Sequence, residues 1–184
     1  MKRLDFFSES LKNLKEVGTV TRSSRYLCRS IADQIDFSKA SVIVELGAGD
    51  GVISRELLKH MTPDSKLIAF EINEAFSEDL EKFDDERLLF YKRSAEELKD
   101  ILKEQGIEKV DYVVSALPFS VMPDAVGDDI VTQCRDSIRS GGKFVQVHYS
   151  LVKKGLYKSK FGNVKVNFVL KNLPPAFLLI SNKS

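Results

Sequence analysis

Apolar residues recur along most of the chain in short runs, and the segments between these runs show helical spacing. The runs are rich in Val, Ile, Leu and Phe, which is typical of strands buried in a parallel sheet. The intervening segments place apolar residues three or four positions apart, the spacing of one helix face. Strands are therefore predicted at 42–46, 66–71, 87–91, 110–115 and 142–148, and helices at 51–60, 74–82, 95–105 and 124–139.

Both ends of the chain depart from this alternation. Two further helices are predicted before the first strand, at 3–15 and 23–35. After Tyr149, two β-like runs at 163–170 and 176–181 are joined by five residues, which leave no room for a crossover helix, so these runs should form an antiparallel hairpin. The expected fold is α/β and Rossmann-like, with a seven-stranded, mostly parallel sheet, a C-terminal antiparallel hairpin and helices on both faces.

Length and composition limit the domain organisation. A chain of 184 residues, 43% of them hydrophobic, suits one domain spanning 1–184, with a helical cap at 1–35 and the Rossmann-like core at 40–184. No apolar run approaches the roughly 20 residues of a membrane span, and the start lacks the apolar stretch of a signal peptide, so we expect a cytoplasmic protein. Cys28 and Cys134 have no second ligand at zinc spacing, so we expect buried free thiols and no metal site.

The net charge of +1 conceals an uneven distribution. Residues 31–136 contain twelve Lys and Arg against twenty-four Asp and Glu, whereas residues 137–184 contain nine against none and residues 1–30 seven against three. A basic surface suits an anionic partner, and both lipid headgroups and nucleic-acid backbones fit this description. The predicted helix at 3–15 is amphipathic and weakly basic, which fits either a cap on the domain or peripheral binding to the inner membrane face.

The most specific pattern is the turn after the first predicted strand. Strand 42–46 runs into Gly47, Gly49 and Gly51, and closely spaced glycines allow a tight turn and the close approach of a ligand to the backbone. Glu71 ends the second strand, where a carboxylate can accept hydrogen bonds from both hydroxyls of a ribose. These features predict a nucleoside-type cofactor site. A nicotinamide dinucleotide site is the rival, but it favours Gly-x-Gly-x-x-Gly spacing over the Gly-x-Gly-x-Gly spacing found here.

These features resemble those of class I S-adenosylmethionine-dependent methyltransferases. The resemblance rests on Glu-x-Gly-x-Gly-x-Gly at 45–51, on Glu71, and on Ser-Ala-Leu-Pro-Phe at 115–119, where the fourth strand ends. The expected antiparallel hairpin also belongs to that fold.

Three further segments, at 17–27, 146–149 and 172–176, resemble bacterial phospholipid N-methyltransferases, and this similarity covers nearly the whole chain. The motif at 115–119 also resembles the Asn-Leu-Pro-Tyr/Phe signature of the related ribosomal RNA adenine dimethyltransferases. Ala116 stands where that signature has Asn, the residue that holds the target amino group in those enzymes.

The resemblance implies S-adenosylmethionine as the cofactor, held at the ends of the first four strands. Ser94 stands where these enzymes usually have an Asp for the adenine amino group, and its hydroxyl can accept the same hydrogen bond. Glu96 is the alternative contact, or a carboxylate that only stabilises a helix start. The implied cofactor-binding residues are Glu45, Gly47, Ala48, Gly49, Gly51, Glu71, Ile72, Ser94, Ala95, Glu96, Ser115 and Ala116.

Methyl transfer is expected at the end of the fourth strand, where the protein has to align an amine with the methyl carbon and exclude water. Pro118 stiffens the loop and removes a donor, so that nearby carbonyls can face the amine, while Phe119 either walls the pocket or fills the core. Tyr149 should open onto the same cleft, and the adjacent His148 is either a general base or a structural residue. The implied catalytic residues are Leu117, Pro118, Phe119 and Tyr149.

The leading hypothesis is an N-methyltransferase that acts on phosphatidylethanolamine-type phospholipid headgroups at an anionic membrane surface. The alternative partner is RNA, as for the ribosomal RNA adenine N6-dimethyltransferases, but Ala116 and the lack of room for a helical RNA-binding domain after the sheet argue against it. A non-catalytic cofactor-binding module is a third hypothesis. The three glycines, Glu71 and the Pro118 loop argue against that one.

Overall fold

The computed structural model describes residues 22–184, without the side chain of Ser77. The predicted helix at 3–15 and residues 17–21 of the lipid-enzyme segment lie outside the described residues.

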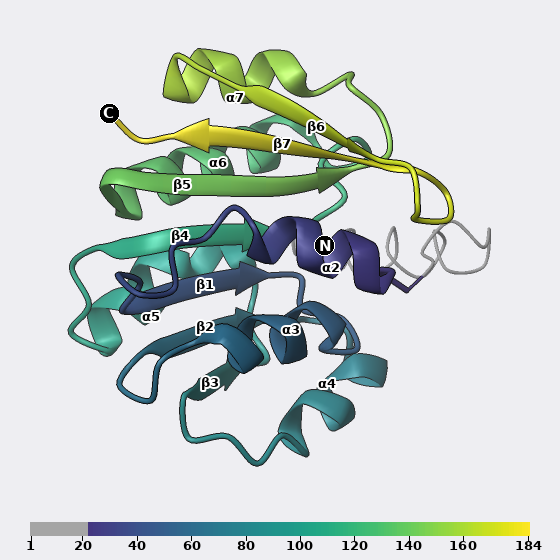
Figure 1. Cartoon of the computed structure of the whole chain (residues 1–184). Helices are drawn as coiled ribbons and strands as arrows, with labels where there is room; N and C mark the ends of the chain where they lie inside the picture. The colour runs from purple at the N-terminus through teal and green to yellow at the C-terminus, as the bar shows by residue number, and fades with distance from the viewer. Residues whose placement is uncertain (1–21) are drawn as a thin grey trace.

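The core of the fold is a sheet of seven strands in the order β3-β2-β1-β4-β5-β7-β6 (Figure 1). Strands β1 to β5 run parallel, and β7 runs antiparallel to its neighbours β5 and β6. This arrangement confirms the predicted mostly parallel sheet with a C-terminal hairpin. The strands are β1 (Val42–Leu46), β2 (Lys66–Phe70), β3 (Leu88–Tyr91), β4 (Val110–Ser115), β5 (Ile138–His148), β6 (Lys165–Val169) and β7 (Ala176–Asn182).

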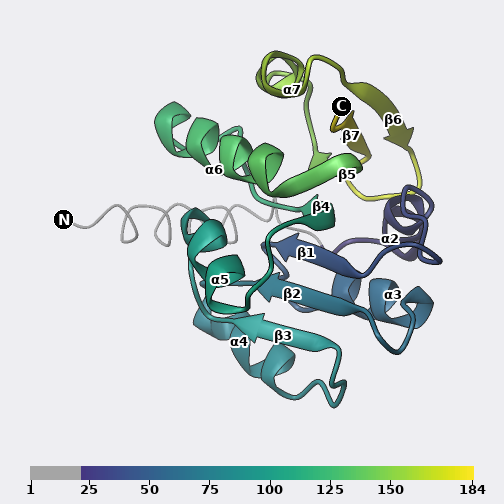
Figure 2. The same ribbon diagram turned by 90° about the vertical axis from the view of Figure 1, so that its left-hand side faces the viewer.

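Helices cover both faces of the sheet (Figure 2). One face packs against α2 and α3, and the other packs against α5, α6 and α7, so that the sheet separates two apolar clusters. Leu80 of α4 forms a smaller cluster with Ala48 and Ala69. The helices are α2 (Arg25–Ala32), α3 (Val52–His60), α4 (Glu74–Glu81), the 3₁₀ turn η1 (Ala95–Glu97), α5 (Leu98–Glu104), α6 (Asp124–Ser137) and α7 (Lys154–Phe161).

Two parts of the fold differ from the sequence expectations. Helix α7 was not predicted, because only Tyr157 and Phe161 in its eight residues are buried and give an apolar signal. Strand β5 begins at Ile138 rather than 142, and its register with β4 shifts before Lys143. The irregular stretch contains Gly142, where a Cβ would lie 2.4 Å from a backbone oxygen of β4.

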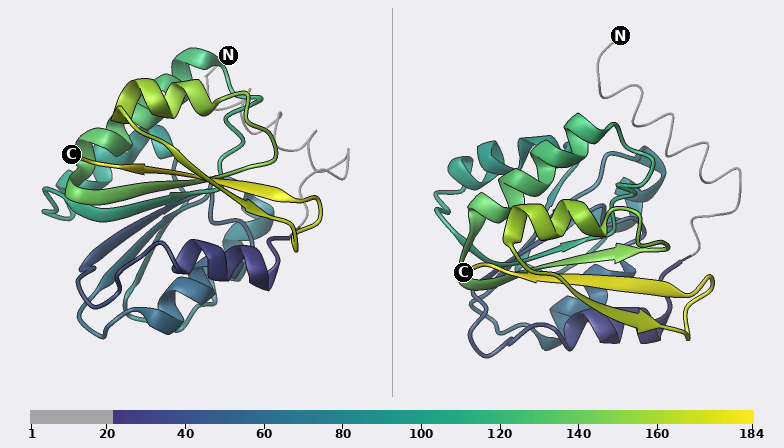
Figure 3. Two further views of the ribbon diagram at one scale, coloured as in Figure 1. Left: turned by 45° about the horizontal axis from the view of Figure 1, so that its top comes forward. Right: turned by 90° about the horizontal axis from the view of Figure 1, so that it is seen from above.

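The chain order places a topological switch between β1 and β4. From β1 the chain moves outward through β2 and β3, and it then returns to β4 on the other side of β1. Ligands of open α/β sheets bind at the carboxyl ends of the strands beside such a switch. The β6–β7 turn lies at the same edge, beside the start of α2 (Figures 1 and 3), where the Ser24 backbone N–H donates to Asn172 Oδ1 at 2.9 Å.

No helix between residues 22 and 184 is long and apolar enough to cross a membrane.

Candidate functional site

A cleft of about 570 Å³ opens at the carboxyl edge of the sheet, at the switch between β1 and β4. Its walls come from the loops that follow β1, β2, β3, β4 and β5, and from Arg22 and Ser23 ahead of α2. The volume lies within the range typical of small-molecule sites. The topology and the cleft therefore agree on where a ligand binds.

The glycine turn forms one wall of the cleft. Gly49 has a φ of +56°, and a Cβ placed there would meet no atom within 4 Å, so the open side of this residue is available to a ligand. Gly51 has a different reason to be glycine: its φ is +73°, and a Cβ would lie 2.6 Å from the Phe83 ring. Gly47 and Gly49 line the cleft, whereas Ala48 and Gly51 are buried beside it.

Glu71 is held rigidly at the end of β2. It is 7% exposed, and its two carboxylate oxygens accept hydrogen bonds from the Gly49 N–H at 2.9 Å and the Asn73 N–H at 2.8 Å. Each oxygen keeps a further lone pair. A fixed carboxylate on the wall of the cleft fits the two ribose hydroxyls of an adenosyl group, so the residues present suit the expected cofactor.

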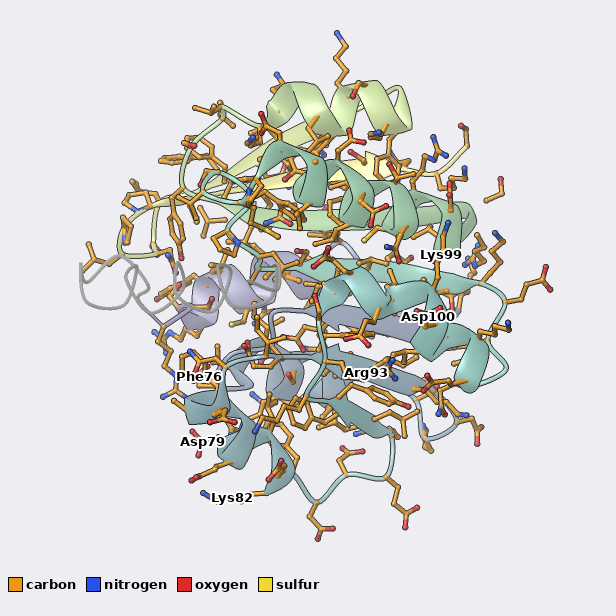
Figure 4. All side chains as sticks on the ribbon, turned by 180° about the vertical axis from the view of Figure 1, so that it is seen from behind. Phe76, Asp79, Lys82, Arg93, Lys99 and Asp100 are labelled. Atoms are coloured by element: carbon orange, nitrogen blue, oxygen red, sulfur yellow. The ribbon has the colours of Figure 1, made fainter. Side chains whose placement is uncertain are left out.

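The wall next to Glu71 carries apolar and cationic side chains. Ile72 and Ala95 line the cleft, together with Phe76 of α4 and Arg93, which follows β3 (Figure 4). The Arg93 guanidinium lies 2.7 Å from Glu97 and 3.0 Å from Glu104, and hydrogen bonds with these carboxylates raise its pKa further above the ordinary value. Arg93 is thus held in place by two carboxylates.

Glu45 lies beneath the glycine turn, away from solvent. Its Oε2 accepts a hydrogen bond from the Ser54 hydroxyl at 2.6 Å, and its Oε1 has no hydrogen-bond partner among the described residues. Burial raises the pKa of Glu45 to about 8; the Ser54 hydrogen bond opposes this shift, and the charges of Glu71 and Asp50 add to it. At this pKa Glu45 carries a proton at neutral pH, and its hydrogen bond with Ser54 connects β1 to α3.

An ion pair between Arg22 and Asp50 lines one side of the cleft. Arg22 Nε lies 2.8 Å from Asp50 Oδ2, and both residues line the cleft. Neither was predicted as a site residue. Asp50 could have been predicted as a site residue, because it lies within the glycine motif. Arg22 reaches the cleft only because the fold brings it next to Asp50.

Ser94 has a local structural role. Its hydroxyl accepts a hydrogen bond from the Glu96 N–H at 3.2 Å, and the Ser94 N–H donates to Glu97 at 3.1 Å, which makes a capping box at the start of η1. Neither Ser94 nor Glu96 lines the cleft, whereas Ala95 between them does. An adenine contact from Ser94 or Glu96 stays a prediction.

Hydrogen bonds occupy two carbonyls of the loop after β4 and leave the Ala116 carbonyl without a partner among the described residues. The Leu117 carbonyl accepts hydrogen bonds from the Gln146 side chain and the Phe119 N–H, both at 2.9 Å, and the Pro118 carbonyl accepts one from Val121 at 3.0 Å. The Ala116 carbonyl has no such partner among residues 22–184. Ala116, Leu117 and Pro118 all line the cleft.

Two residues of this loop face the protein interior. Ser115 is fully buried, and its hydroxyl accepts a hydrogen bond from the Leu117 N–H at 3.3 Å. Phe119 is 1% exposed, with its ring edge-on to Tyr157 and the centroids 6.2 Å apart. Of the two roles considered for Phe119, the structure shows the core position.

The end of β5 contributes two side chains that diverge. His148 Nε2 lies 2.7 Å from the buried Tyr157 hydroxyl on α7, and burial lowers the pKa of His148 to about 4, with a further contribution from Lys153. Tyr149 is 44% exposed, and burial raises its pKa while a side-chain hydrogen bond with Asn172 opposes the shift. Both His148 and Tyr149 border the cleft, and His148 is neutral at physiological pH.

The cleft gathers many of the predicted residues, but not all of them. The lining includes Gly47, Gly49, Glu71, Ile72, Ala95, Ala116, Leu117, Pro118 and Tyr149, whereas Glu45, Ala48, Gly51, Ser94, Glu96, Ser115 and Phe119 lie outside it.

Within residues 22–184 there is no group of three or more His, Cys, Asp or Glu side chains that could hold a metal ion.

Known proteins similar in sequence to this chain include methyltransferases. A family model described as a methyltransferase domain matches residues 44–144. The ornithine lipid N-methyltransferase of Singulisphaera acidiphila is 30% identical over 174 residues, which cover 93% of this chain and 91% of that protein. The ribosomal RNA small subunit methyltransferase A of Thermotoga neapolitana is 30% identical over 122 residues, which cover 66% of this chain but only 44% of that protein.

The fold is also found among solved structures. The precorrin-6y C5,15-methyltransferase of Geobacter metallireducens superposes with a TM-score of 0.69 and covers 87% of this chain and 89% of its own, at 16% sequence identity. At that identity the similarity supports the architecture alone.

Proposed function

The chain belongs to the methyltransferase domain family and is an S-adenosylmethionine-dependent methyltransferase, and from this premise we propose that it methylates the amine of a polar lipid headgroup. The substrate class expected from the sequence is a phosphatidylethanolamine-type phospholipid. The similar ornithine lipid enzyme supports a lipid amine as the acceptor and adds ornithine lipids to the substrates worth testing.

The observation that carries this proposal is the chemistry at Ala116. This residue lines the cleft and offers only a methyl group as its side chain, so it provides no amide to pair with the edge of a nucleic-acid base. Its backbone carbonyl has no hydrogen-bond partner among the described residues. One such carbonyl can accept one N–H of a small amine, which is enough to aim the nitrogen lone pair.

The cofactor residues are proposed from the geometry of the cleft. When bound, S-adenosylmethionine supplies a methyl group activated by the positive charge on its sulfur. Glu71 would hold the ribose hydroxyls, and Gly47 and Gly49 would allow close approach of the backbone. The buried Phe119 ring beneath the loop keeps Pro118 and Ala116 in position, so that alignment is achieved before the acceptor enters.

The acceptor ammonium has to lose a proton before it can react. With a pKa of about 4, His148 is too weak a base to remove it efficiently. We propose instead that the apolar wall of the cleft lowers the pKa of the ammonium by withdrawing water from it, and that the proton leaves to solvent. In this scheme the Tyr149 hydroxyl orients the headgroup through a hydrogen bond.

Labelled S-adenosylmethionine provides the direct test. The protein is incubated in parallel with vesicles that contain phosphatidylethanolamine, with vesicles that contain ornithine lipid, and with small-subunit ribosomal RNA, and the label in each pool is measured. We expect label in lipid and at least tenfold less in RNA. Label in RNA alone would replace this proposal with the adenine methyltransferase alternative.

A matched variant sharpens this test. Ala116→Asn supplies the amide that the RNA enzymes carry at this position. If the lipid proposal holds, the variant should lose lipid methylation without gaining adenine methylation. If it gains adenine methylation, the remainder of an RNA site is present after all.

We also propose that the protein works at an anionic membrane surface as a peripheral protein. The support is the charge of residues 137–184, which contain nine Lys and Arg and no Asp or Glu and which form β5, α7 and the β6–β7 hairpin on one side of the cleft.

A further inference from the structure

Large exposed apolar side chains gather on three loops at one edge of the molecule. Val121 lies in the loop after β4, Leu151 and Val152 lie in the loop after β5, and Leu170 and Leu173 lie in the β6–β7 turn. These five residues are called the apolar rim below. Val152 is 81% exposed, Leu173 is 78% exposed and Leu170 is 69% exposed.

The sheet topology brings the three loops together. Strand β6 runs antiparallel to β7, and β7 runs antiparallel to β5, so β6 ends at the same edge as β4 and β5. Figure 1 shows the β6–β7 turn at the edge where β5 ends. The Asn172 side chain lies close enough to Tyr149 to influence its pKa, so the loop after β5 and this turn are neighbours.

The apolar rim adjoins the cleft. Val121 belongs both to the rim and to the cleft lining. Tyr149 and Ser150, which also line the cleft, immediately precede Leu151 and Val152 in the chain. Single exposed aliphatic residues are ordinary, but a group of them around the mouth of a site indicates a contact surface.

Cations surround the rim. Lys154 follows the loop after β5, Lys171 stands in the β6–β7 turn, and Arg25 starts α2. The Lys171 ammonium and the Arg25 guanidinium each lie 4.9 Å from the centroid of the Tyr26 ring. Aliphatic tips together with Lys, Arg and an aromatic ring are the composition that binds at the interface of an anionic bilayer.

Acidic residues near this edge are paired, buried in the cleft wall as Glu71 is, or placed at its far end. Asp124, at the start of α6, forms an ion pair with Lys153. Helix α4, with Glu78, Asp79 and Glu81, lies near β3, which is the opposite edge strand from β6. The half of the edge that carries the apolar rim is therefore the basic half.

We propose that the apolar rim docks on a lipid bilayer that contains anionic lipid, with Val152, Leu170 and Leu173 inserted among the headgroups and the cleft mouth at headgroup level. This inference rests on the proposed lipid substrate and adds the surface through which the protein reaches it. A bilayer is favoured over RNA because exposed aliphatic tips gain from entering an apolar phase and gain nothing from a phosphate backbone.

The test uses the full chain with the double variant Val152→Asp/Leu173→Asp. The control Thr62→Asp/Ser140→Asp adds the same charge at the opposite edge, on exposed positions near the starts of β2 and β5. Co-flotation with vesicles of phosphatidylethanolamine and phosphatidylglycerol measures binding. We expect the rim variant to bind at least tenfold more weakly than the parent, and the control to bind as the parent does.

Methylation separates docking from chemistry. The rim variant should methylate phosphatidylethanolamine in vesicles at least tenfold more slowly, yet methylate dihexanoyl phosphatidylethanolamine, dispersed as monomers, within twofold of the parent rate. If the parent methylates no lipid but the rim variant still loses vesicle binding, the proposed substrate fails while the docking surface stands. If the variant floats with vesicles as the parent does, the docking proposal is overturned.

Other occupants of the rim give different results. A fall in melting temperature of the rim variant well beyond that of the control would show that the protein covers the rim itself. A parent dimer that the rim variant converts to monomers would identify a subunit interface. Loss of binding to structured RNA, with vesicle binding unchanged, would assign the surface to RNA. Each of these results overturns bilayer docking.

A charge reversal provides an independent check. Lys171→Glu reverses a charge beside the apolar rim, at the carboxyl ends of the strands. Lys103→Glu makes the same change at the end of α5, near the amino ends of the strands. At low salt the first substitution should weaken vesicle binding severalfold and the second should not, and the difference should shrink as salt rises. Equal effects of the two substitutions would contradict docking through the rim.

Discussion

Removal of the Glu71 carboxylate should separate cofactor binding from folding. Glu71→Ala removes the acceptor that we propose for the two ribose hydroxyls, and it also removes the acceptor of the Gly49 and Asn73 N–H groups, which bond to the carboxylate at 2.9 and 2.8 Å. The substitution therefore has two separable consequences, one for affinity and one for stability.

The magnitudes differ because the two sets of donors differ in access to water. A buried ribose pair left without its charged acceptor costs about 1–3 kcal/mol, which corresponds to a loss of cofactor affinity of roughly 5- to 150-fold. The two backbone N–H groups border an open cleft, where water can replace the carboxylate, so we expect the free energy of unfolding to fall by only about 1 kcal/mol.

Calorimetry with S-adenosylhomocysteine measures the affinity, and urea unfolding of the cofactor-free protein measures the stability. Glu78→Ala, on the exposed surface of α4, is the control for the change in charge and should leave both quantities near the parent values. Parent-like affinity in Glu71→Ala would refute the assignment of the ribose to this carboxylate. A loss of affinity that merely tracks a loss of folded protein would refute it equally.

Four other substitutions test the residues that surround and support the cleft. Burial raises the pKa of Glu45 to about 8, so the folded protein holds a proton that the unfolded chain releases above about pH 4.3. The free energy of unfolding should therefore decline from about pH 4.5 to 8, by on the order of 5 kcal/mol. Glu45→Gln should flatten this decline in urea titrations, and parallel pH curves would contradict it. Tyr149→Phe should lower the methylation rate with cofactor affinity unchanged, whereas Phe119→Ala should lower the free energy of unfolding by about 3–5 kcal/mol, because its ring is buried. Gly51→Ala should cost about 2–4 kcal/mol in thermal unfolding, since a Cβ would lie 2.6 Å from the Phe83 ring at a positive φ.

The fold was largely predictable because its strands are strong and continuous signals. From β1 to α6 the predicted elements match the observed ones to within about two residues at each end. Helix α7 was missed because, apart from Tyr157 and Phe161, its residues are Lys, Gly, Leu and Ser at half-buried or exposed positions. Its stability comes from packing on α6 and β7. The start of β5 at Ile138 was not predicted, because the irregular pairing there depends on β4, which is distant in the sequence.

The candidate site was predictable where function constrains the backbone. Gly49 and Glu71 could be predicted from their residue types after strand ends, and the structure places both in the wall of the cleft. Ser94 and Phe119 also lie at strand ends, but the direction of a side chain in an irregular loop depends on packing, and these two serve a cap and the core. Arg22 belongs to the segment 17–27 that resembles the lipid enzymes, but its place on the cleft could not be predicted, because its ion pair with Asp50 exists only once the chain is folded.

The uneven charge along the sequence becomes an uneven charge across the cleft. The acidic stretch 31–136 builds β1 to β4 and α6, and thus the wall with Glu71 and Asp50, where a cofactor with a positive sulfur is favoured. The basic stretch 137–184 builds β5 to β7 and the loops that carry most of the apolar rim. The near-zero net charge is therefore the sum of an acidic half, which suits a cationic methyl donor, and a basic half, which suits the anionic lipid surface that we propose.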